Sequence, residues 1–337
     1  MNTSASGQYK FILTAVLVFI CLMVGLQAHE KMSSLQQAKL LSDEVNIDLL
    51  MNDVFWLADD ARLGRASGTP SEDEVAAWLI KRYEDLKLEQ FKKLGLSNFT
   101  HNFEFHVYDD MGVEHPAFGE NIIGIIPGKE EPNKYLIVSA HYDHLGIEDG
   151  MIHNGADDDA TGVAAVLEIA RVIKDMGLQP NKTIIFAAFS AEEIGRYGSR
   201  NFCHMIYDKQ ITKNMMGLNF EMFGIARNLN NVGPMYMHIW EQQTVATQPI
   251  IQAVKTASDA LNVDMITSFD IDPGSDALEL LDCGVSATTM DVGGGERFEF
   301  YHPYYHSPED KPEHIDQRSF HKAVQVASMS VWLLANE

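Results

Sequence analysis

From Asn121 onward, apolar runs of strand length alternate with segments of helical periodicity, and this alternation limits the folds that the chain can adopt. The runs of strand length occupy residues 121–127, 135–140, 183–190, 215–223 and 285–290. Their apolar residues stand at successive positions, which is typical of strands buried on both faces. The pattern predicts an α/β fold: a single domain whose central, mixed but mostly parallel sheet is flanked by helices on both faces.

The N-terminal third of the chain has a different sequence pattern. An apolar run at 11–26 follows Lys10 and predicts a signal peptide or N-terminal anchor over residues 1–28. It is shorter than the roughly 20 residues that cross a bilayer comfortably. We therefore expect an exported protein, periplasmic or secreted, without stable membrane insertion unless the leader stays uncleaved. We expect residues 29–100 to form a helical N-terminal part of the domain and residues 101–337 to form its core.

Composition narrows the possible partners. The chain has 48 acidic and 25 basic residues, a formal charge of −23, and this excess repels phosphate backbones and anionic membranes. Nucleic-acid binding is therefore disfavoured. Hydrophobic residues make up 46% of the 337 residues, enough for a sizeable core. Outside the leader, the two cysteines Cys203 and Cys283 either pair or remain buried thiols.

Polar residues follow directly on two of the predicted strands. His141 and Asp143 stand two positions apart, so they lie on one side of the chain and the carboxylate can orient the imidazole. Glu192 and Glu193 close another run, where adjacent side chains point in different directions. One glutamate can thus bind a metal while the other acts as a general base. Each pair alone also has an ordinary structural explanation.

Three further positions are chemically conspicuous. Asp157, Asp158 and Asp159 sit between glycines just before a helix, in a loop that can aim one carboxylate inward, although acids also favour helix N-termini. Glu221 is the only charged residue in its apolar run, and a carboxylate inside a buried strand needs a partner or a metal. His306 lies in a loop rich in aromatic residues and proline.

Together these residues supply two imidazoles, three carboxylate ligands and a spare glutamate. Nitrogen and oxygen donors without thiolate suit zinc, with manganese or cobalt as substitutes, in a site that leaves a position open for water. The predicted metal ligands are His141, Asp158, Glu193, Glu221 and His306.

The motifs HYDHLG, NGADDDATG, FSAEEIG, NFEMFG and YHSPED occur in an order that resembles the co-catalytic di-zinc aminopeptidases, metallopeptidase family M28. The resemblance runs from about Leu50, where LADDARLGRASGTPSEDEVAAWL is similar to the family's N-terminal segment, to the last helix. It implies a zinc exopeptidase (phosphorylase/hydrolase-like) fold with two zinc ions. His141 and Glu193 would bind different ions, and Asp158 would bridge them. Glu221 would complete the His141 ion, and His306 the Glu193 ion.

The same resemblance implies three catalytic positions. Asp143 would orient the first histidine, Glu192 would be the general base, and Tyr305 would polarise the scissile carbonyl, as a tyrosine does in some relatives. Two positions depart from the pattern. Glu221 stands where aspartate is commonest, and Ala277 stands where many relatives have histidine, so substrate contacts are expected to differ.

We therefore expect a metal-dependent exopeptidase that acts on peptides, an aminopeptidase whose di-zinc-activated water attacks the bond after the N-terminal residue. Carboxypeptidase, dipeptidase and single-zinc glutaminyl cyclase activity on the same scaffold are alternatives. A non-catalytic binding protein is another. Cyclase relatives work with fewer ligands and binding proteins usually lose some, so the complete set of five favours hydrolysis. The sequence does not indicate an oligomeric state.

Overall fold

The protein is described by a computed structural model over residues 32–108, 111–224, 235–238, 244–268, 274–292 and 303–336. The leader predicted at 1–28, with its apolar run at 11–26, lies outside these residues. Within the described ranges, no helix combines the length and the apolar character needed to cross a membrane.

The centre of the molecule is a nine-stranded sheet in the order β1-β3-β7-β4-β8-β11-β9-β10, with β2 paired to β3. Strands β4, β7, β8 and β11 are parallel to their neighbours in the middle of the sheet, whereas β3 runs antiparallel to β7 and β9 to β11. This confirms the mixed, mostly parallel sheet. The strands are β1 Glu89–Gln90, β2 Thr100–Tyr108, β3 Glu114–Ile126, β4 Glu131–His141, β7 Lys182–Phe189, β8 Met215–Phe220, β9 Met235–His238, β10 Met265–Ser268 and β11 Ser286–Val292, and a separate hairpin is formed by β5 Gly146–Glu148 and β6 Met151–His153.

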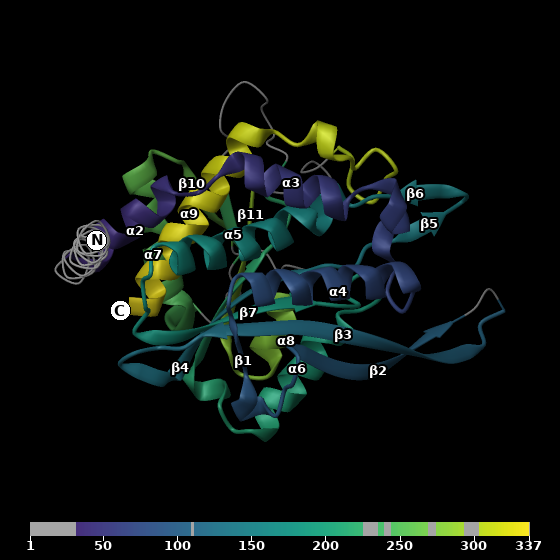
Figure 1. Ribbon diagram of the computed structural model, residues 1–337, viewed down its shortest axis with the longest axis horizontal. Helices are drawn as coiled ribbons and strands as arrows, with labels where there is room; N and C mark the ends of the chain where they lie inside the picture. The colour runs from purple at the N-terminus through teal and green to yellow at the C-terminus, as the bar shows by residue number, and fades with distance from the viewer. Residues whose placement is uncertain are drawn as a thin grey trace, which may run out of the picture.

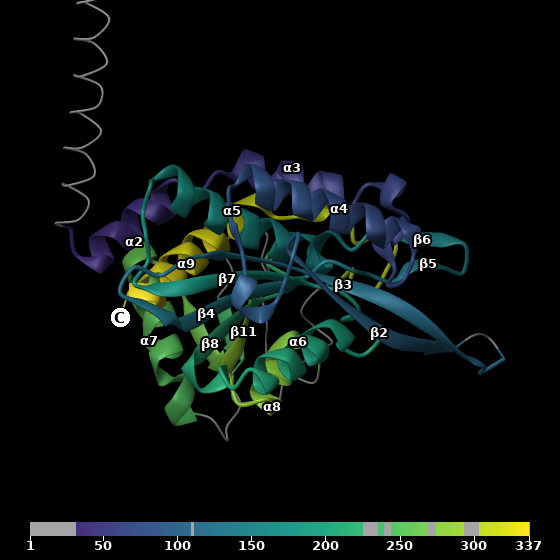
Figure 2. The same ribbon diagram turned by 60° about the horizontal axis from the view of Figure 1, so that its bottom comes forward.

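Helices cover both faces of the sheet (Figure 1, Figure 2). Six of them share one hydrophobic core with the sheet: α2 Ser34–Asp43, α3 Ile47–Leu57, α4 Pro70–Asp85, α5 Gly162–Asp175, α7 Thr244–Leu261 and α9 Gln317–Asn336. The other face is covered by α6 Tyr197–Asp208 and α8 Asp276–Asp282, which belong to a second core. The two cores explain why the strands carry continuous apolar runs.

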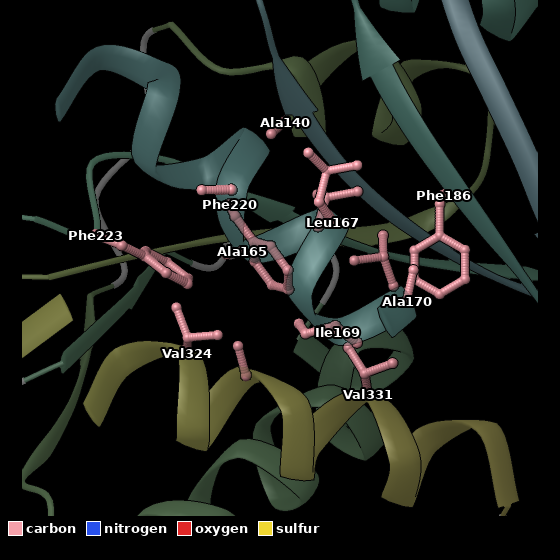
Figure 3. Close-up of a cluster of buried hydrophobic side chains, with 14 of the residues drawn as sticks. Ala140, Ala165, Leu167, Ile169, Ala170, Phe186, Phe220, Phe223, Val324 and Val331 are labelled. Atoms are coloured by element: carbon pink, nitrogen blue, oxygen red, sulfur yellow. The ribbon is translucent and has the colours of Figure 1, made fainter. Parts of the chain in front are cut away.

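Alternate residues of each central strand enter opposite cores. In β4, Leu136 and Val138 belong to the core under α5 and α9, while Tyr135 and Ile137 face α6 and α8. Figure 3 shows the first core, where Leu167 and Ala170 of α5 lie near Phe186 of β7 and Val331 of α9. The sheet is therefore fixed between two packed layers, and the ends of its strands have firm positions.

Helix α4 begins earlier than the capping-box spacing of Ser71 and Glu74 in the sequence would suggest. It begins at Pro70, and its N-cap is Thr69, whose side chain accepts from the amide of Glu72. Proline at the first helical position favours this earlier start because it needs no hydrogen bond there. Glu72 is consequently turned into the interior, where it is 2% exposed.

Cys203 of α6 and Cys283, just after α8, form a disulfide with a Cα–Cα distance of 5.8 Å. Of the two possibilities left open by the sequence, pairing is the one observed. The bond joins the two helices that cover the second face of the sheet.

Candidate metal centre

The predicted site residues meet at the carboxyl ends of three neighbouring strands, β7, β4 and β8. His141 is the last residue of β4, Glu192 and Glu193 follow β7, and Glu221 directly follows β8. Parallel neighbours end at the same edge of a sheet, so residues far apart in sequence converge there.

Asp158 occupies the centre of this group. It lies in the irregular turn Ala156–Thr161 before α5, its peptide bond to Asp159 is cis, and it is 5% exposed. One carboxylate oxygen, Oδ1, is 3.2 Å from Nε2 of His141. The other, Oδ2, is 3.3 Å from Nε2 of His306. The two oxygens of one carboxylate therefore face two different imidazoles.

Glu193 completes the closest part of the cluster. Its Oε2 is 3.0 Å from Nε2 of His306, and its Oε1 is 2.6 Å from Nδ1 of His144. His144, in the HYDHLG motif, is buried, with 1% exposure. Its contact with Glu193 places it behind the ligand candidates rather than at the surface.

His141, Asp158 and Glu193 offer donor atoms that all lie within 4.8 Å of one another, a spacing that suits a shared metal ion. The donors are imidazole nitrogen and carboxylate oxygen, which are common zinc ligands. Oε1 of Glu193 is buried, and the negative charge of Asp158 acts on the Glu193 carboxylate. Buried carboxylates that repel one another are costly unless a cation compensates them, so the residues present fit a metal ion.

The contacts of Asp143 differ in part from the prediction. Its carboxylate oxygen is 3.8 Å from Nδ1 of His141, whereas its backbone carbonyl oxygen is 3.2 Å from the same nitrogen. The carboxylate instead accepts from the backbone amides of Glu192 and Glu193 and from the hydroxyl of Ser67. Asp143 thus orients the imidazole through its main chain, and its side chain holds the turn with the two glutamates.

Glu192 is 9% exposed. Burial raises its pKa well above the ordinary value, and the negative charges of Asp276, Glu193 and Asp143 add to this effect against the lowering by His141. Asp276 was not predicted. It is fully buried at the start of α8, and burial raises its pKa to about 7. Its position in the Gly274–Thr289 segment, next to the atypical Ala277, was the available signal.

Glu221 and Tyr305 lie at more accessible positions. Glu221 is half-buried beyond the end of β8 rather than inside a buried strand, and its Oε1 accepts from the side-chain amide of Asn219 at 2.8 Å. The Tyr305 ring stacks on His306 with 3.8 Å between centroids. Burial raises the pKa of Tyr305, and the charges of Asp158, Glu193, Glu192 and Glu221 raise it further. The phenol therefore stays protonated near the carboxylates.

The two imidazoles respond strongly to this acidic setting. Burial lowers the pKa of His306, but hydrogen bonding to Asp158 and Glu193 outweighs it and raises the pKa to about 10. For His141, burial also lowers the pKa, while Asp158 and the charge of Glu192 raise it well above the ordinary value. A positive charge is thus favoured at Nε2 of His141 and at Nε2 of His306, whether a proton or a metal ion supplies it.

The loop that carries Asp158 is held by a second acid. The carboxylate of Asp310 accepts from the backbone amides of Asp157 and Asp158 at 2.9–3.1 Å. Burial and the charge of Asp157 raise the pKa of Asp310 to about 7. Asp310 belongs to the YHSPED motif, yet its sequence position alone did not indicate this role.

The fold and these side chains define an α/β protein with a candidate metal site at the carboxyl edge of its sheet. The sequence profile of Peptidase family M28 matches residues 121–331. The chain belongs to this family. Aminopeptidase YwaD of Bacillus subtilis is 27% identical over 214 residues, which cover 63% of this chain and 44% of YwaD. The chain spans less than half the length of this curated relative.

Solved structures share the fold at low identity. A zinc aminopeptidase from Bacillus subtilis, BSAP, superposes with a TM-score of 0.71 at 16% identity, covering 87% of this chain and 96% of that one. Fimbriiglobus ruber glutaminyl cyclase gives a TM-score of 0.67 at 17% identity, with 86% and 96% covered. The scaffold is therefore common to two kinds of enzyme.

Proposed function

We propose that this protein is a zinc aminopeptidase that removes N-terminal residues from peptides. The observation that carries the proposal is the position of Asp158, whose two carboxylate oxygens face the imidazoles of His141 and His306. A carboxylate between two sets of donors is the arrangement that a bridging ligand of two metal ions requires.

The donors divide into two sets around Asp158. His141 and Glu221 would hold one zinc ion, and Glu193 and His306 the other. The second set already contains a direct contact of 3.0 Å between His306 and Glu193. Manganese or cobalt are acceptable substitutes because the same nitrogen and oxygen donors bind them.

Zinc at these donors, when bound, supplies Lewis acidity to the scissile carbonyl and lowers the pKa of a coordinated water. Glu192 takes a proton from the attacking water and delivers it to the leaving amine. Burial raises the pKa of Glu192, which makes its carboxylate a stronger proton acceptor. The neutral Tyr305 phenol can donate to the developing oxyanion. The acidic surroundings attract the positively charged amine of a peptide N-terminus.

The test uses zinc-loaded protein and a panel of amino-acid arylamides, with the N-acetylated arylamides as matched controls. Release of arylamine from the free-amine substrates alone is the expected result. Equal cleavage of the acetylated compounds contradicts aminopeptidase action. Failure to cleave any arylamide or dipeptide while zinc is bound favours a non-catalytic binding protein.

The second candidate is a glutaminyl cyclase, favoured by the shared scaffold with Fimbriiglobus ruber glutaminyl cyclase. Glutamine arylamide separates the two in one assay. An aminopeptidase releases the arylamine, whereas a cyclase releases ammonia and leaves the arylamide bond intact. Metal content gives a second reading, because one tightly bound zinc per chain favours the cyclase and two favour the peptidase.

Export remains part of the proposal through the leader at 1–28. The two cysteines support it: Cys203 and Cys283 are paired, and such bonds persist in oxidising compartments. Fractionation of cells that express the full chain tests the location. Activity confined to the cytoplasm, with residues 1–28 retained, contradicts export.

A further inference from the structure

Arg65 is the only arginine in the buried set of the described residues, and it is 0% exposed. It lies at the end of the short helix Asp60–Arg65, between α3 and α4 and outside the family match at 121–331. A buried guanidinium is costly unless its donors are satisfied, so its partners reveal why it is retained.

All the hydrogen bonds that the guanidinium makes run to backbone carbonyls. Nε donates to Tyr142 at 2.7 Å, Nη2 donates to Gly155 at 2.6 Å and to Asp158 at 3.3 Å, and Nη1 donates to Asn154 and to Leu57. Tyr142 follows the ligand candidate His141, and the 154–158 loop carries Asp158. One rigid side chain thus connects the loops that supply the two ligands.

The backbone around Arg65 adds two further links. The carbonyl of Arg65 accepts from the amide of His144 at 3.4 Å, next to an isolated β-bridge between Ala66 and His144. The hydroxyl of Ser67 donates to Asp143 at 2.7 Å. The segment 64–67, called the arginine clamp below, therefore contacts the 142–144 loop through both its main chain and its side chains.

The arginine clamp is reached through an unfavourable backbone conformation. Leu63, Gly64 and Arg65 all have positive φ angles, of 46°, 68° and 43°. Non-glycine residues adopt this conformation at a cost and persist there only where the surroundings enforce it. A Cβ on Gly64 would lie 2.3 Å from the carbonyl oxygen of His153, so the turn must pack closely against the β5–β6 hairpin.

We propose that Arg65 is a positioning residue that holds the loops carrying His141 and Asp158 in ligand geometry before a metal binds. The inference rests on the proposed metal site. Irregular loops cannot satisfy their own buried carbonyls, and a planar guanidinium offers five donors in fixed directions. A lysine keeps the charge but presents three donors from one point, so it cannot span both loops.

The first test measures zinc affinity by competition with a chromogenic chelator in Arg65→Lys and Arg65→Met. We expect both to bind zinc about 10- to 100-fold more weakly, the range for loss of a residue that supports a ligand. Wild-type affinity in Arg65→Lys, or tighter binding in folded Arg65→Met, overturns the proposal, because either means that charge and not geometry is what Arg65 contributes.

Arg82→Met is the matched control. Arg82 pairs with Asp53 through Nη1 and Nη2 of its guanidinium and links α4 to α3. It belongs to the same helical region but bonds to neither ligand loop. Its variant should lower the unfolding midpoint while leaving zinc affinity unchanged. An equal loss of zinc affinity in Arg82→Met would show that general destabilisation explains the Arg65 variants, and this too overturns the proposal.

A further test measures hydrogen exchange of the metal-free wild-type protein. Its result does not depend on whether the Arg65 variants fold. The amides of Asp157 and Asp158, bonded to Asp310, should be protected without zinc. Fast exchange there, with protection gained only on adding zinc, overturns the proposal. This arm needs neither zinc nor substrate. Its failure is therefore distinct from failure of the proposed peptidase function, which appears as wild-type protein without zinc binding or arylamide cleavage.

Discussion

The strand-end loops within 121–331 and the helical region 32–100 contribute to the site in opposite ways. The first supplies every ligand candidate, from His141 to His306, through side chains. The second supplies no ligand candidate, yet Arg65 and Ser67 bond to the loops that carry them. The difference teaches that the donors are encoded within 121–331, whereas part of their positioning is encoded in the helical region 32–100.

The largest expected effect comes from the donor side. Asp158→Ala removes the carboxylate that faces both imidazoles, so zinc binding and arylamide cleavage should fall to background. The loss should exceed the about 100-fold that removing a supporting residue costs. Zinc content of the purified variant and its turnover measure this. Retained zinc with near-normal turnover contradicts the central role of Asp158.

The Glu192→Gln variant should retain bound zinc but lose most of its peptidase turnover. Amide for carboxylate leaves the shape unchanged but removes the proton acceptor, so kcat should fall about 10²- to 10⁴-fold with KM little changed. Zinc analysis of the same sample is the control. Turnover close to wild type in the zinc-loaded variant rules out Glu192 as the general base.

The disulfide allows a comparison with the face of the sheet that α6 and α8 cover, opposite the helical region 32–100. The double variant Cys203→Ser/Cys283→Ser should lose about 2–4 kcal/mol of unfolding free energy, because the bond closes a loop of sequence separation 80. Zinc affinity should stay at the wild-type level, since neither α6 nor α8 carries a ligand candidate. Denaturant unfolding and chelator competition measure the two quantities. A large loss of zinc affinity would mean that this face also positions the donors.

The smallest expected effect is a pH dependence in the helical region. Burial and the nearby charge of Asp143 raise the pKa of Glu72 to about 8, although its hydrogen bonds with Ser190 and Gly68 lower it. The folded state then binds a proton that the unfolded state releases above its lower pKa of 4.5. This contribution to stability is present at low pH and is lost as the pH rises towards 8.

Glu72→Gln should remove that dependence. An amide can still accept from the Gly68 amide and donate to the Ser190 hydroxyl, which now donates to Glu72 at 2.6 Å. The change in slope of unfolding free energy between about pH 5 and 8 should be at most about 1.4 kcal/mol per pH unit. Denaturant unfolding at several pH values measures it. Identical slopes in variant and wild type contradict a raised pKa at Glu72.

Much of the fold was predictable because burial on both faces leaves a direct mark on sequence. The apolar run at 135–140 falls within β4, and the run at 183–190 coincides with β7 except for its last residue, Ser190. The start of α4 was not fixed by the local sequence, because Thr69 and Ser71 are both good caps and Pro70 decided between them.

The candidate site was predictable where chemistry is carried by a side chain at a strand end. The convergence of His141, Asp158 and Glu193 follows from parallel strands ending at one edge. The partners of Asp143 were not predictable, since a period of two along a strand does not show that the chain turns after His141. The main-chain carbonyl took the place expected for the carboxylate.

The sequence by itself determined the fold class, the family and the set of candidate donors, because buried strands and chemically unusual side chains are visible as residue types. Only the tertiary structure decided which oxygen of Asp158 faces which imidazole, that Cys203 pairs with Cys283, and that Arg65 holds the ligand loops. The physical reason is that these contacts depend on backbone positions brought together over long separations. A carbonyl oxygen is the same group in every residue, so its need for a donor leaves no mark on the sequence.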